Sequence, residues 1–352
     1  MSDLPLVSVI IPMRNEAGHI AACVDSVLAQ DYPADQIEVI VVDGDSDDDS
    51  AAVLRRYGAG VRVLRNPSRI VPTAMNIGIA AAQGQIIARV DAHTVIAPDY
   101  IRMGVETLQR TGADNVGGPM HAVGGGRMGD AIALAMSSRF GIGAYFHFGR
   151  AERQVGTVYM GMYPWRVFER IGLFDEELVR NQDDELNYRL RKAGGRILFT
   201  PRMQSRYQNR QSLKGLARQF FQYGMWKIRV LQKHPRQMRL RQFVPPLFVL
   251  AVVTTALVTP WSAMAPRLFV AVITAYAAAW VVAAGVAARR HGWHHLVPLL
   301  AAFATMHLSW GSGFLAGALR FAHRWVTDEP PPPRLQPPLI AGRELVRSAA
   351  AE

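Results

Sequence analysis

The segment Val7-Ser-Val-Ile-Ile-Pro12 introduces the pattern that decides the fold. It is a short apolar run, rich in β-branched residues and ended by a proline, which is typical of a buried strand. Similar runs follow at Glu38-Val-Ile-Val-Val-Asp43, at 61–64 and at Ile86-Ile-Ala-Arg-Val-Asp91. Helical patterns lie between the runs, at 20–29, around Val53 and Leu54, and at 73–82. Buried strands that alternate with helices predict an α/β fold with a mostly parallel, Rossmann-like sheet covered on both faces.

Polar residues follow three of these predicted strands directly. The three clusters are Arg14-Asn15-Glu16, Asp43-Gly44-Asp45 and Asp91-Ala92-His93. In a doubly wound sheet, ligands bind at the carboxyl ends of the strands, and these ends meet at one edge. We therefore expect the three clusters to come together and to form the functional site.

Composition limits where the protein works. Its 352 residues are 50% hydrophobic and carry a formal net charge of +11, with a mean hydropathy of +0.07. The single cysteine, Cys23, excludes an intrachain disulfide and agrees with a reducing compartment. Residues 1–5 lack the basic region of a signal peptide, and the apolar run that follows is too short for its core. We expect the N-terminal domain to stay in the cytoplasm.

The positive charge is concentrated just before the most apolar part of the chain. Lys and Arg recur from Arg206 to Arg241 without any acidic residue between them. Within this stretch, Ser212–Arg229 has apolar residues at helical spacing and resembles an amphipathic helix lying in a membrane interface. Juxtamembrane Lys and Arg mark the cytoplasmic side and attract anionic lipid. We therefore expect membrane lipid as a partner and no nucleic acid; a solvated charged face is the alternative.

Three apolar segments follow, each near the roughly 20 residues that a membrane crossing needs. They are Phe243–Ala263, Leu268–Ala288 and Leu296–Leu319. They predict a multi-pass protein of the cell (inner) membrane with its catalytic domain in the cytoplasm. Arg289 and Arg290 agree with a cytoplasmic loop, but three crossings would place Arg320 and Arg324 outside. Either the third segment is not a simple crossing or the charge rule is broken here.

The chain accordingly divides into four predicted regions. A catalytic domain occupies 1–205, the basic interface helix region 206–241, and the transmembrane region, with about three helices, 242–320. The tail, 321–352, is rich in proline and is expected to be disordered.

The cluster at Asp91 and His93 could bind a metal ion. A carboxylate and an imidazole two residues apart on a turn could both reach a divalent cation; Mg²⁺ prefers oxygen ligands, whereas imidazole also suits Mn²⁺ or Zn²⁺. Such an ion would neutralise a diphosphate leaving group. The alternative is an ordinary turn. In the second cluster, Asp43 is assigned to nucleotide recognition, while Asp47–Asp49 suit the start of the next helix.

Six segments, in order, resemble the family 2 glycosyltransferases of GT-A fold, and most closely the branch that assembles succinoglycan. They span nearly all of the predicted catalytic domain. The segments are Val7-Ser-Val-Ile-Ile-Pro-Met-Arg-Asn-Glu16, Val41-Val-Asp-Gly-Asp-Ser46, Ala74-Met-Asn-Ile-Gly78, Arg89-Val-Asp-Ala-His93, Ile171-Gly-Leu-Phe-Asp175 and Asn181-Gln-Asp-Asp-Glu-Leu186.

The resemblance implies a role for each matching position. Asp91 and His93 take the place of the family's metal-binding Asp-x-Asp, with Mn²⁺ or Mg²⁺ as the cofactor and the metal identity in doubt because of His93. Asp183 is implied as the catalytic base, within a segment that matches Glu-Asp-x-Asp. The residues implied for the nucleotide sugar are Pro12, Arg14, Asn15, Glu16, Asp43, Asn76 and Asp91.

A carboxylate at Asp183 suits the expected chemistry. It can remove the proton of an acceptor hydroxyl that attacks the anomeric carbon opposite the departing diphosphate, and direct attack inverts that centre. Asp184 and Glu185 remain alternatives, and some of these acids could simply begin the helix that follows. Asp184 and Trp226 are expected near the acceptor, although Trp226 could equally anchor the interface helix. Met225 replaces the arginine of the processive motif, so processivity is not inferred.

Two other functions compete with a transferase. A nicotinamide-dependent oxidoreductase is excluded because no Gly-x-Gly-x-x-Gly follows the first strand. A non-catalytic membrane scaffold with a transferase-like domain stays open, although the acids needed for catalysis are present. By family analogy the donor is expected to be a UDP-sugar. The apolar segments favour a membrane-bound acceptor, such as a polyprenyl-linked sugar, in polysaccharide or glycolipid assembly.

Overall fold

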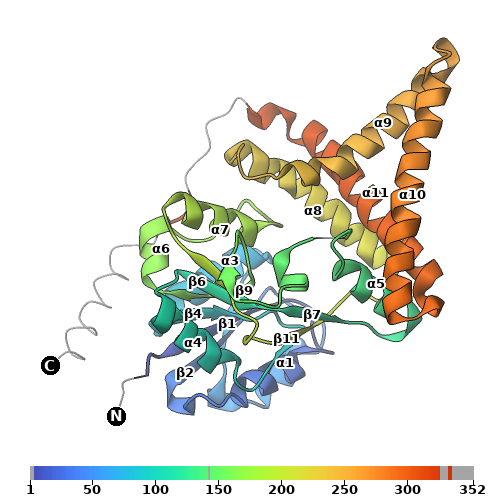
Figure 1. The fold of residues 1–352 in the computed structure, drawn as a ribbon. Coiled ribbons are helices and arrows are strands. Elements are labelled where there is room, and N and C mark those ends of the chain that lie inside the picture. The colour runs from blue at the N-terminus through green and yellow to red at the C-terminus, as the bar shows by residue number, and fades with distance from the viewer. Residues whose placement is uncertain (1–3, 142, 326–331, 335–352) are drawn as a thin grey trace. The chain divides into compact units, whose positions relative to one another are not determined.

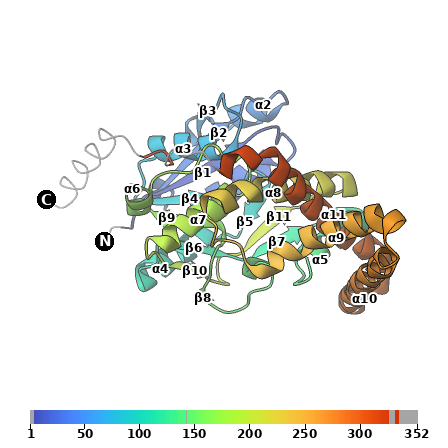
Figure 2. The ribbon, with the colours of Figure 1, turned by 90° about the horizontal axis from the view of Figure 1, so that it is seen from above.

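An eight-stranded mixed sheet forms the centre of the N-terminal part in a computed structural model that describes residues 4–141, 143–325 and 332–334. Figure 2 shows the strands side by side in their order. That order is β3 (Arg62–Arg65), β2 (Ile37–Asp43), β1 (Val7–Met13), β4 (Ile86–Arg89), β9 (Tyr159–Pro164), β6 (Asn115–Gly118), β10 (Ile197–Phe199) and β8 (Arg153–Gln154). β9 and β8 run antiparallel to their neighbours and the other described strands share one direction. The predicted α/β fold with a mostly parallel sheet is confirmed.

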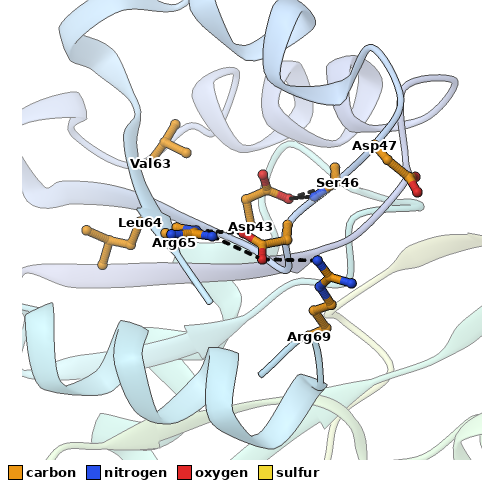
Figure 3. A pocket seen from close by; sticks show the side chains of 8 residues that line it. Asp43, Ser46, Asp47, Val63, Leu64, Arg65 and Arg69 are labelled. Carbon is orange, nitrogen blue, oxygen red and sulfur yellow. Dashed lines mark hydrogen bonds and ion pairs between the residues drawn. The ribbon is translucent and has the colours of Figure 1, made fainter. Parts of the chain in front are cut away.

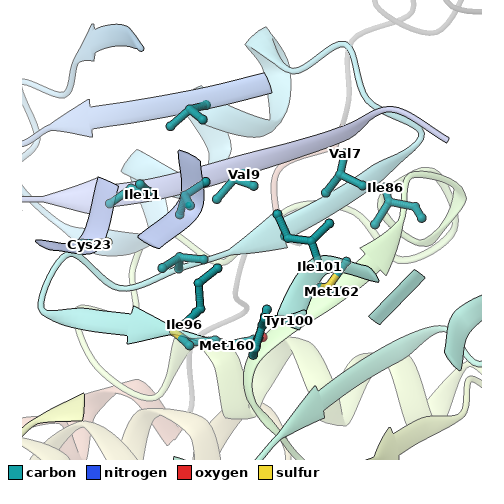
Figure 4. Close-up of a cluster of buried hydrophobic side chains, with 14 of the residues drawn as sticks. Val7, Val9, Ile11, Cys23, Ile86, Ile96, Tyr100, Ile101, Met160 and Met162 are labelled. Carbon is teal, nitrogen blue, oxygen red and sulfur yellow. The ribbon is translucent and has the colours of Figure 1, made fainter. Parts of the chain in front are cut away.

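Both faces of the sheet are covered, as its apolar strands predict. Along β1, Val7, Val9 and Ile11 belong to the large hydrophobic cluster in Figure 4. Ile10 points to the other face, where Gly78 lets helix α3 (Val71–Ala81) approach closely: a Cβ on Gly78 would lie 2.5 Å from Ile10 Cγ2. Every side chain of β1 is therefore buried, which explains why its sequence is apolar except at Ser8, whose hydroxyl donates to Glu38.

The remaining elements complete the N-terminal part. A second sheet has the order β5 (Thr94–Ile96), β11 (Ser205–Gln208) and β7 (Met120–Val123). The other helices are α1 (Ile20–Leu28), α2 (Ser50–Arg55), α4 (Tyr100–Thr111), α6 (Arg166–Ile171) and α7 (Gln182–Lys192).

Two element boundaries differ from the sequence prediction in a way that matters for the site. The strand expected to reach Asp91 ends at Arg89, so Asp91 lies on the turn that leaves the sheet. The helix expected from Leu186 begins at Gln182, so Asp183 lies inside its first turn. Hydrophobic periodicity could not predict either boundary. The residues that extend α7 are polar, and Asp91 stands at the end of an apolar run.

The chain divides into two compact units, and the division differs from the predicted boundary at residue 205. The first unit contains 4–121, 149–207 and 332–334; the second contains 122–141, 143–148 and 208–325. The segment 122–148 was expected in the catalytic domain but packs with the C-terminal helices. Its hydrogen bonds explain this: His307 Nε2 lies 2.9 Å from the Phe140 carbonyl oxygen, and Arg241 donates to the Gly143 carbonyl oxygen at 2.7 Å.

The second unit is helical. It consists of α5 (Gly126–Met136), α8 (Leu213–Lys233), α9 (Val244–Val258), α10 (Ala265–His291) and α11 (Leu296–Arg320), drawn from green to orange-red in Figure 1. Within the described part of the chain, three helical stretches are long and apolar enough to cross a membrane: Leu240–Trp261, Ala265–His291 and Trp293–Arg320. They correspond to the three predicted segments.

Most of the Pro-rich tail, predicted to be disordered, lies outside the described residues. A short 3-10 helix, Ala322–Trp325, follows α11. Further along, the Pro333 carbonyl oxygen accepts a hydrogen bond from the Leu173 amide at 2.8 Å, within the first unit.

Candidate active site

Hydrogen bonds join the loops that follow β1 and β2. The Asn15 amide donates to Ser46 Oγ at 2.9 Å, and the Asp47 amide donates to Asn15 Oδ1 at 3.0 Å. Ser46 Oγ in turn donates to Asp43 Oδ1 at 2.6 Å. Asn15 has a φ of 56°, a left-handed conformation that asparagine tolerates better than most residues. Two of the predicted polar clusters therefore meet, as the topology required.

An open pocket of about 580 Å³ lies beside this junction (Figure 3). Asp45 forms ion pairs with Arg65 at 2.6 Å and with Arg69 at 3.4 Å. The hydrogen bond from Arg65 is the main reason that the pKa of Asp45 is lowered. The lining residues are Asp43, Asp45, Ser46, Asp47, Val63, Leu64, Arg65 and Arg69. The pocket offers three carboxylates, two guanidinium groups that both pair with Asp45, and a small apolar wall, a combination that suits a polar ligand with hydrogen-bond donors.

Arg89 and Asp91 form a nearly buried ion pair where β4 ends. Arg89 Nε and Nη2 both lie 2.8 Å from Asp91 Oδ1, and the two side chains are 13% and 14% exposed. Burial alone would raise the pKa of Asp91, but the charges of Arg89 and His93, together with hydrogen bonds, lower it below the ordinary value. Asp91 is therefore held as a carboxylate at neutral pH.

His93 links this turn to the loop after β1. Its Nδ1 lies 2.9 Å from Glu16 Oε1, and its ring meets the edge of Tyr207 with centroids 5.0 Å apart. Tyr207 in turn lies 5.9 Å from Tyr159, whose hydroxyl is 2.7 Å from Thr94 Oγ1. The third predicted cluster thus joins the other two through Glu16.

Asp183 approaches the same place from α7. It is half-buried in the first turn of the helix, and its Oδ1 accepts the Asp184 amide at 2.9 Å. Burial is the main reason that the pKa of Asp183 is raised. The negative charges of Asp184 and Asp91 raise this pKa further, whereas the positive charge of Arg89 lowers it. Arg89 therefore lies in the electrostatic field of two carboxylates, Asp91 and Asp183, whose pKa values move in opposite directions. Such divergence is typical of a site that assigns different roles to two acids.

Glu185, one of the alternatives for the base, makes structural contacts. It is 1% exposed, and its two carboxylate oxygens accept from Arg189 at 2.6 Å and 2.9 Å. Arg189 also donates to the Leu173 carbonyl oxygen at 2.7 Å. The pair thus fastens α7 to the segment before it. Asp184, the other alternative and a predicted acceptor contact, is half-buried beside Asp183, and both roles remain predictions.

The other predicted residues lie in different surroundings. Asn76 is buried in α3, where Nδ2 donates to the Phe174 carbonyl oxygen at 2.9 Å and to Glu176 at 2.8 Å. These bonds hold the segment that precedes α7 against α3. Pro12 is buried within β1, and Arg14 is exposed on the loop after it. Trp226 belongs to α8 in the second unit, where its ring lies 5.4 Å from Phe321.

Five residues of the site were not assigned from the sequence: Arg65, Arg69, Arg89, Tyr159 and Tyr207. Arg89 offered a signal, because it is a charged residue in an otherwise apolar run, two positions before Asp91. The two tyrosines come from distant strands, and no local pattern connects them to His93.

A metal ion at this place would need partners besides the protein. Among the residues that the structure describes, no group of three or more His, Cys, Asp or Glu side chains could hold one. Asp91 and His93, two residues apart on one turn, would be the two protein ligands. This fits Mg²⁺ or Mn²⁺ at a nucleotide site, where one or two protein ligands suffice because phosphate oxygens and waters complete the shell.

Comparison with known proteins places the chain. The family model described as glycosyl transferase family 2 matches residues 8–171. Succinoglycan biosynthesis protein ExoA of Rhizobium meliloti is 33% identical over 325 residues, covering 90% of this chain and 96% of that protein. A dolichyl N-acetyl-α-D-glucosaminyl phosphate 3-β-D-2,3-diacetamido-2,3-dideoxy-β-D-glucuronosyltransferase of Methanococcus voltae is 27% identical, covering 64% of this chain and 74% of its own.

Among solved structures, the mannosyltransferase PcManGT of Pyrobaculum calidifontis, in complex with GDP-mannose and Mn²⁺, is similar in fold. It has a TM-score of 0.52 and 22% identity, over 87% of this chain and 88% of that one. The matching motifs, the mixed sheet and the extent of similarity to ExoA lead to one conclusion. This chain belongs to glycosyltransferase family 2 and has the GT-A fold.

Proposed function

We propose that the protein is an inverting glycosyltransferase that moves a sugar from a nucleoside diphosphate to a membrane-bound acceptor. One observation carries the proposal: Arg89, Asp91 and Asp183, from elements ninety residues apart, form one electrostatic cluster in which Asp91 has a lowered pKa and Asp183 a raised one. A permanently ionised carboxylate and a proton-accepting one are the two acids that this reaction uses.

The donor is proposed to occupy the joined loops and the pocket. Asp43 would recognise the base, since a carboxylate accepts the ring N–H of uracil, and Arg65 and Arg69 line the same pocket. A UDP-sugar is the donor expected from the family resemblance. The structure of PcManGT contains GDP-mannose and Mn²⁺, which supports a nucleotide sugar as the donor and a divalent cation as the cofactor of this protein.

Asp183 is proposed as the base. A carboxylate whose pKa is raised by burial is a stronger base than that of a free aspartate. It would take the proton of the acceptor hydroxyl as the oxygen attacks the anomeric carbon. The bond to the diphosphate breaks on the opposite side, so the configuration at that carbon inverts. A divalent cation held by Asp91 and His93 would offset the negative charge of the leaving diphosphate.

The acceptor is proposed to be a polyprenyl-linked sugar at the inner membrane. The three apolar helices support a multi-pass location, and the basic residues around α8 support a cytoplasmic catalytic domain. The name of the M. voltae relative describes a transferase acting on a dolichyl-phosphate-linked sugar, and that of ExoA a protein of succinoglycan biosynthesis. A membrane-tethered enzyme would meet such an acceptor at high effective concentration.

The test is a donor screen on detergent-purified protein. Release of nucleoside diphosphate from UDP-, GDP- and TDP-sugars is followed with membrane lipid extract, with Mn²⁺, Mg²⁺ or EDTA. Wild type is compared with Asp183→Asn and with the matched control Asp184→Asn.

Release from one donor that requires a metal and is lost only in Asp183→Asn would support the whole proposal. Equal loss in Asp184→Asn would move the base by one residue. No release from any donor would favour a membrane scaffold with a transferase-like domain.

A further inference from the structure

Glu16 lies on a loop whose backbone is held on both sides of it. Its amide donates to Ser50 Oγ at 2.9 Å, and its carbonyl oxygen accepts from the amides of His19 and Ile20, each at 2.8 Å. Asn15, directly before it, is held by two hydrogen bonds to the loop after β2. The root of the Glu16 side chain is therefore fixed, and its carboxylate can act on a neighbour from a defined place.

That neighbour is one nitrogen of the His93 ring. Glu16 Oε1 lies 2.9 Å from His93 Nδ1, and the two side chains are 20% and 23% exposed. An ionised carboxylate is an acceptor only, so the hydrogen of this bond belongs to Nδ1. In the neutral ring the contact selects the tautomer with Nδ1–H, which leaves the lone pair on Nε2.

The second ring nitrogen of His93 is available to a ligand. Within the described part of the chain, Nε2 has no hydrogen-bond partner, and it is not among the buried polar atoms that lack one, so it reaches solvent. Tyr207 meets the ring edge-on with centroids 5.0 Å apart, and Tyr207 is itself held opposite Thr94 where β11 pairs with β5. Glu16 and Tyr207 therefore hold the ring in one orientation with Nε2 accessible.

Asp91, two residues earlier, is supported in a similar way. Arg89 Nε and Nη2 both lie 2.8 Å from its Oδ1. The Asp91 carbonyl oxygen accepts from the Thr94 amide at 2.9 Å, which closes the turn that carries both proposed metal ligands. Each ligand thus has a partner of opposite character behind it, Arg89 for Asp91 and Glu16 for His93. Partners of this kind orient the atoms that bind a metal ion.

Two other roles for Glu16 agree less well with the geometry. As a third metal ligand it would have to converge with Asp91 and His93, but no such group of three is found among the residues that the structure describes. As a contact of the nucleotide sugar, the role that the family resemblance implies, its carboxylate would have to leave His93 or be shared with it. At 2.9 Å from Nδ1, Oε1 is already engaged.

We propose that Glu16 is a positioning residue for His93: it accepts the Nδ1 hydrogen and keeps Nε2 available to a divalent cation. The carboxylate also makes the ring a stronger ligand, because it stabilises the positive charge that the ring gains when Nε2 binds a cation. Two carboxylates then favour the cation, Asp91 directly and Glu16 through the ring. The inference rests on the proposed function, since this cation is the one proposed to offset the charge of the leaving diphosphate.

Mn²⁺ binding without turnover tests the inference. The detergent-purified full chain is titrated with Mn²⁺ in the presence of UDP or GDP. The free ion is followed by its electron paramagnetic resonance signal, with correction for Mn²⁺ held by free nucleotide. Four proteins are compared: wild type, Glu16→Gln, His93→Asp and the double variant. His93→Asp offers an oxygen ligand without a ring N–H, so in this background Glu16 has no hydrogen to accept.

Glu16→Gln alone should weaken Mn²⁺ binding about 10–100-fold. In the His93→Asp background the same change should weaken it about threefold or less, which is the screened attraction between one carboxylate and a divalent cation. Mn²⁺ bound to wild type should show electron spin echo modulation from a directly coordinated nitrogen, which His93→Asp should lack. Glutamine keeps the length of the side chain and the backbone bonds of Glu16, so the melting temperature should stay close to that of wild type.

Equal weakening of Mn²⁺ binding in both backgrounds would overturn the inference, because Glu16 would then act through its charge or through the loop. Unchanged binding in Glu16→Gln, or a wild-type echo without nitrogen modulation, would overturn it as well. Weaker binding of the nucleoside diphosphate to Glu16→Gln in EDTA would make Glu16 a nucleotide contact instead. These results leave the donor screen unaffected, whereas failure of wild type to bind Mn²⁺ with either nucleotide would also contradict the metal site of the proposed function.

Discussion

Replacing Asp183 by asparagine should separate catalysis from stability. Loss of a positioned general base lowers the rate about 10²–10⁴-fold, which corresponds to about 3–5 kcal/mol in the activation barrier. Stability should not fall, because burial and the neighbouring acids already disfavour the charged form of Asp183 in the folded protein. Asparagine removes that unfavourable charge and keeps the shape of the side chain.

The sign of the pH effect follows from the raised pKa of Asp183. The folded protein binds this proton more tightly than the unfolded chain does. The stabilisation is complete below the ordinary pKa of about 3.9 and is lost as pH rises through the folded-state pKa. Asp183→Asn lacks this loss, so its melting temperature relative to wild type should increase as pH rises from about 4 through the folded-state pKa of Asp183.

Glu185→Gln, two positions away, is the matched contrast. Glu185 is 1% exposed and accepts two hydrogen bonds from Arg189, and removal of one partner of a buried pair costs about 3–5 kcal/mol. At about 2–4 °C per kcal/mol for a unit of this size, the melting temperature should fall by roughly 6–12 °C at the lower estimate. Turnover per folded molecule should stay within a few fold of wild type.

The two variants are compared by nucleoside diphosphate release and by thermal unfolding in the same detergent. A rate for Asp183→Asn within tenfold of wild type would refute its role as base. A melting temperature lowered as much as in Glu185→Gln would show that Asp183 is structural, and the argument from its raised pKa would fail.

Three further outcomes are expected. The rate should rise with pH through an ionisation above the ordinary aspartate range, because the pKa of Asp183 is raised, and Asp183→Asn should lack this acid limb in its pH–rate profile. Arg69→Ala, in the pocket, should raise KM for the donor about tenfold and leave kcat unchanged. The control Arg55→Ala, outside the pocket lining, should change neither constant. A fall in kcat alone for Arg69→Ala would contradict a role of Arg69 in donor binding. Gly317→Leu should destabilise the second unit by about 1–3 kcal/mol or more, because its Cβ would meet the Met225 carbonyl oxygen. The control Gly285→Leu should be tolerated, because a Cβ there meets nothing within 4 Å. Equal protease resistance of the two variants would contradict the backbone contact of α8 and α11.

Several features of the site required the folded chain. Arg89 stood in a quoted motif, but its interaction with the charges of both Asp91 and Asp183 depends on bringing α7 near β4, about ninety residues away in the chain. The choice between Asp183 and Glu185 was open because both acids lie in the same helical turn. The structure narrows this choice, because Arg189, one turn further on, pairs with Glu185, whereas Asp183 interacts electrostatically with Arg89 and Asp91.

The C-terminal part shows the same division. Apolar length located three segments, since hydrophobicity is a local property of the chain. It could not distinguish α11 from α9 and α10, because the glycines that place α11 against α8 act through close backbone contact. Nor could it show that 122–148 packs with these helices, since that depends on His307 and Arg241, more than ninety residues away.

The sequence by itself determined the fold class, the family and the meeting of three polar clusters at one sheet edge. These follow from strand order and from residues adjacent in the chain, where the carboxyl ends of parallel strands necessarily converge. Only the tertiary structure decided which acids are ionised, which are used for packing and which apolar helices remain uncovered. Those properties depend on burial and on charges brought together from distant segments, and no local pattern encodes either.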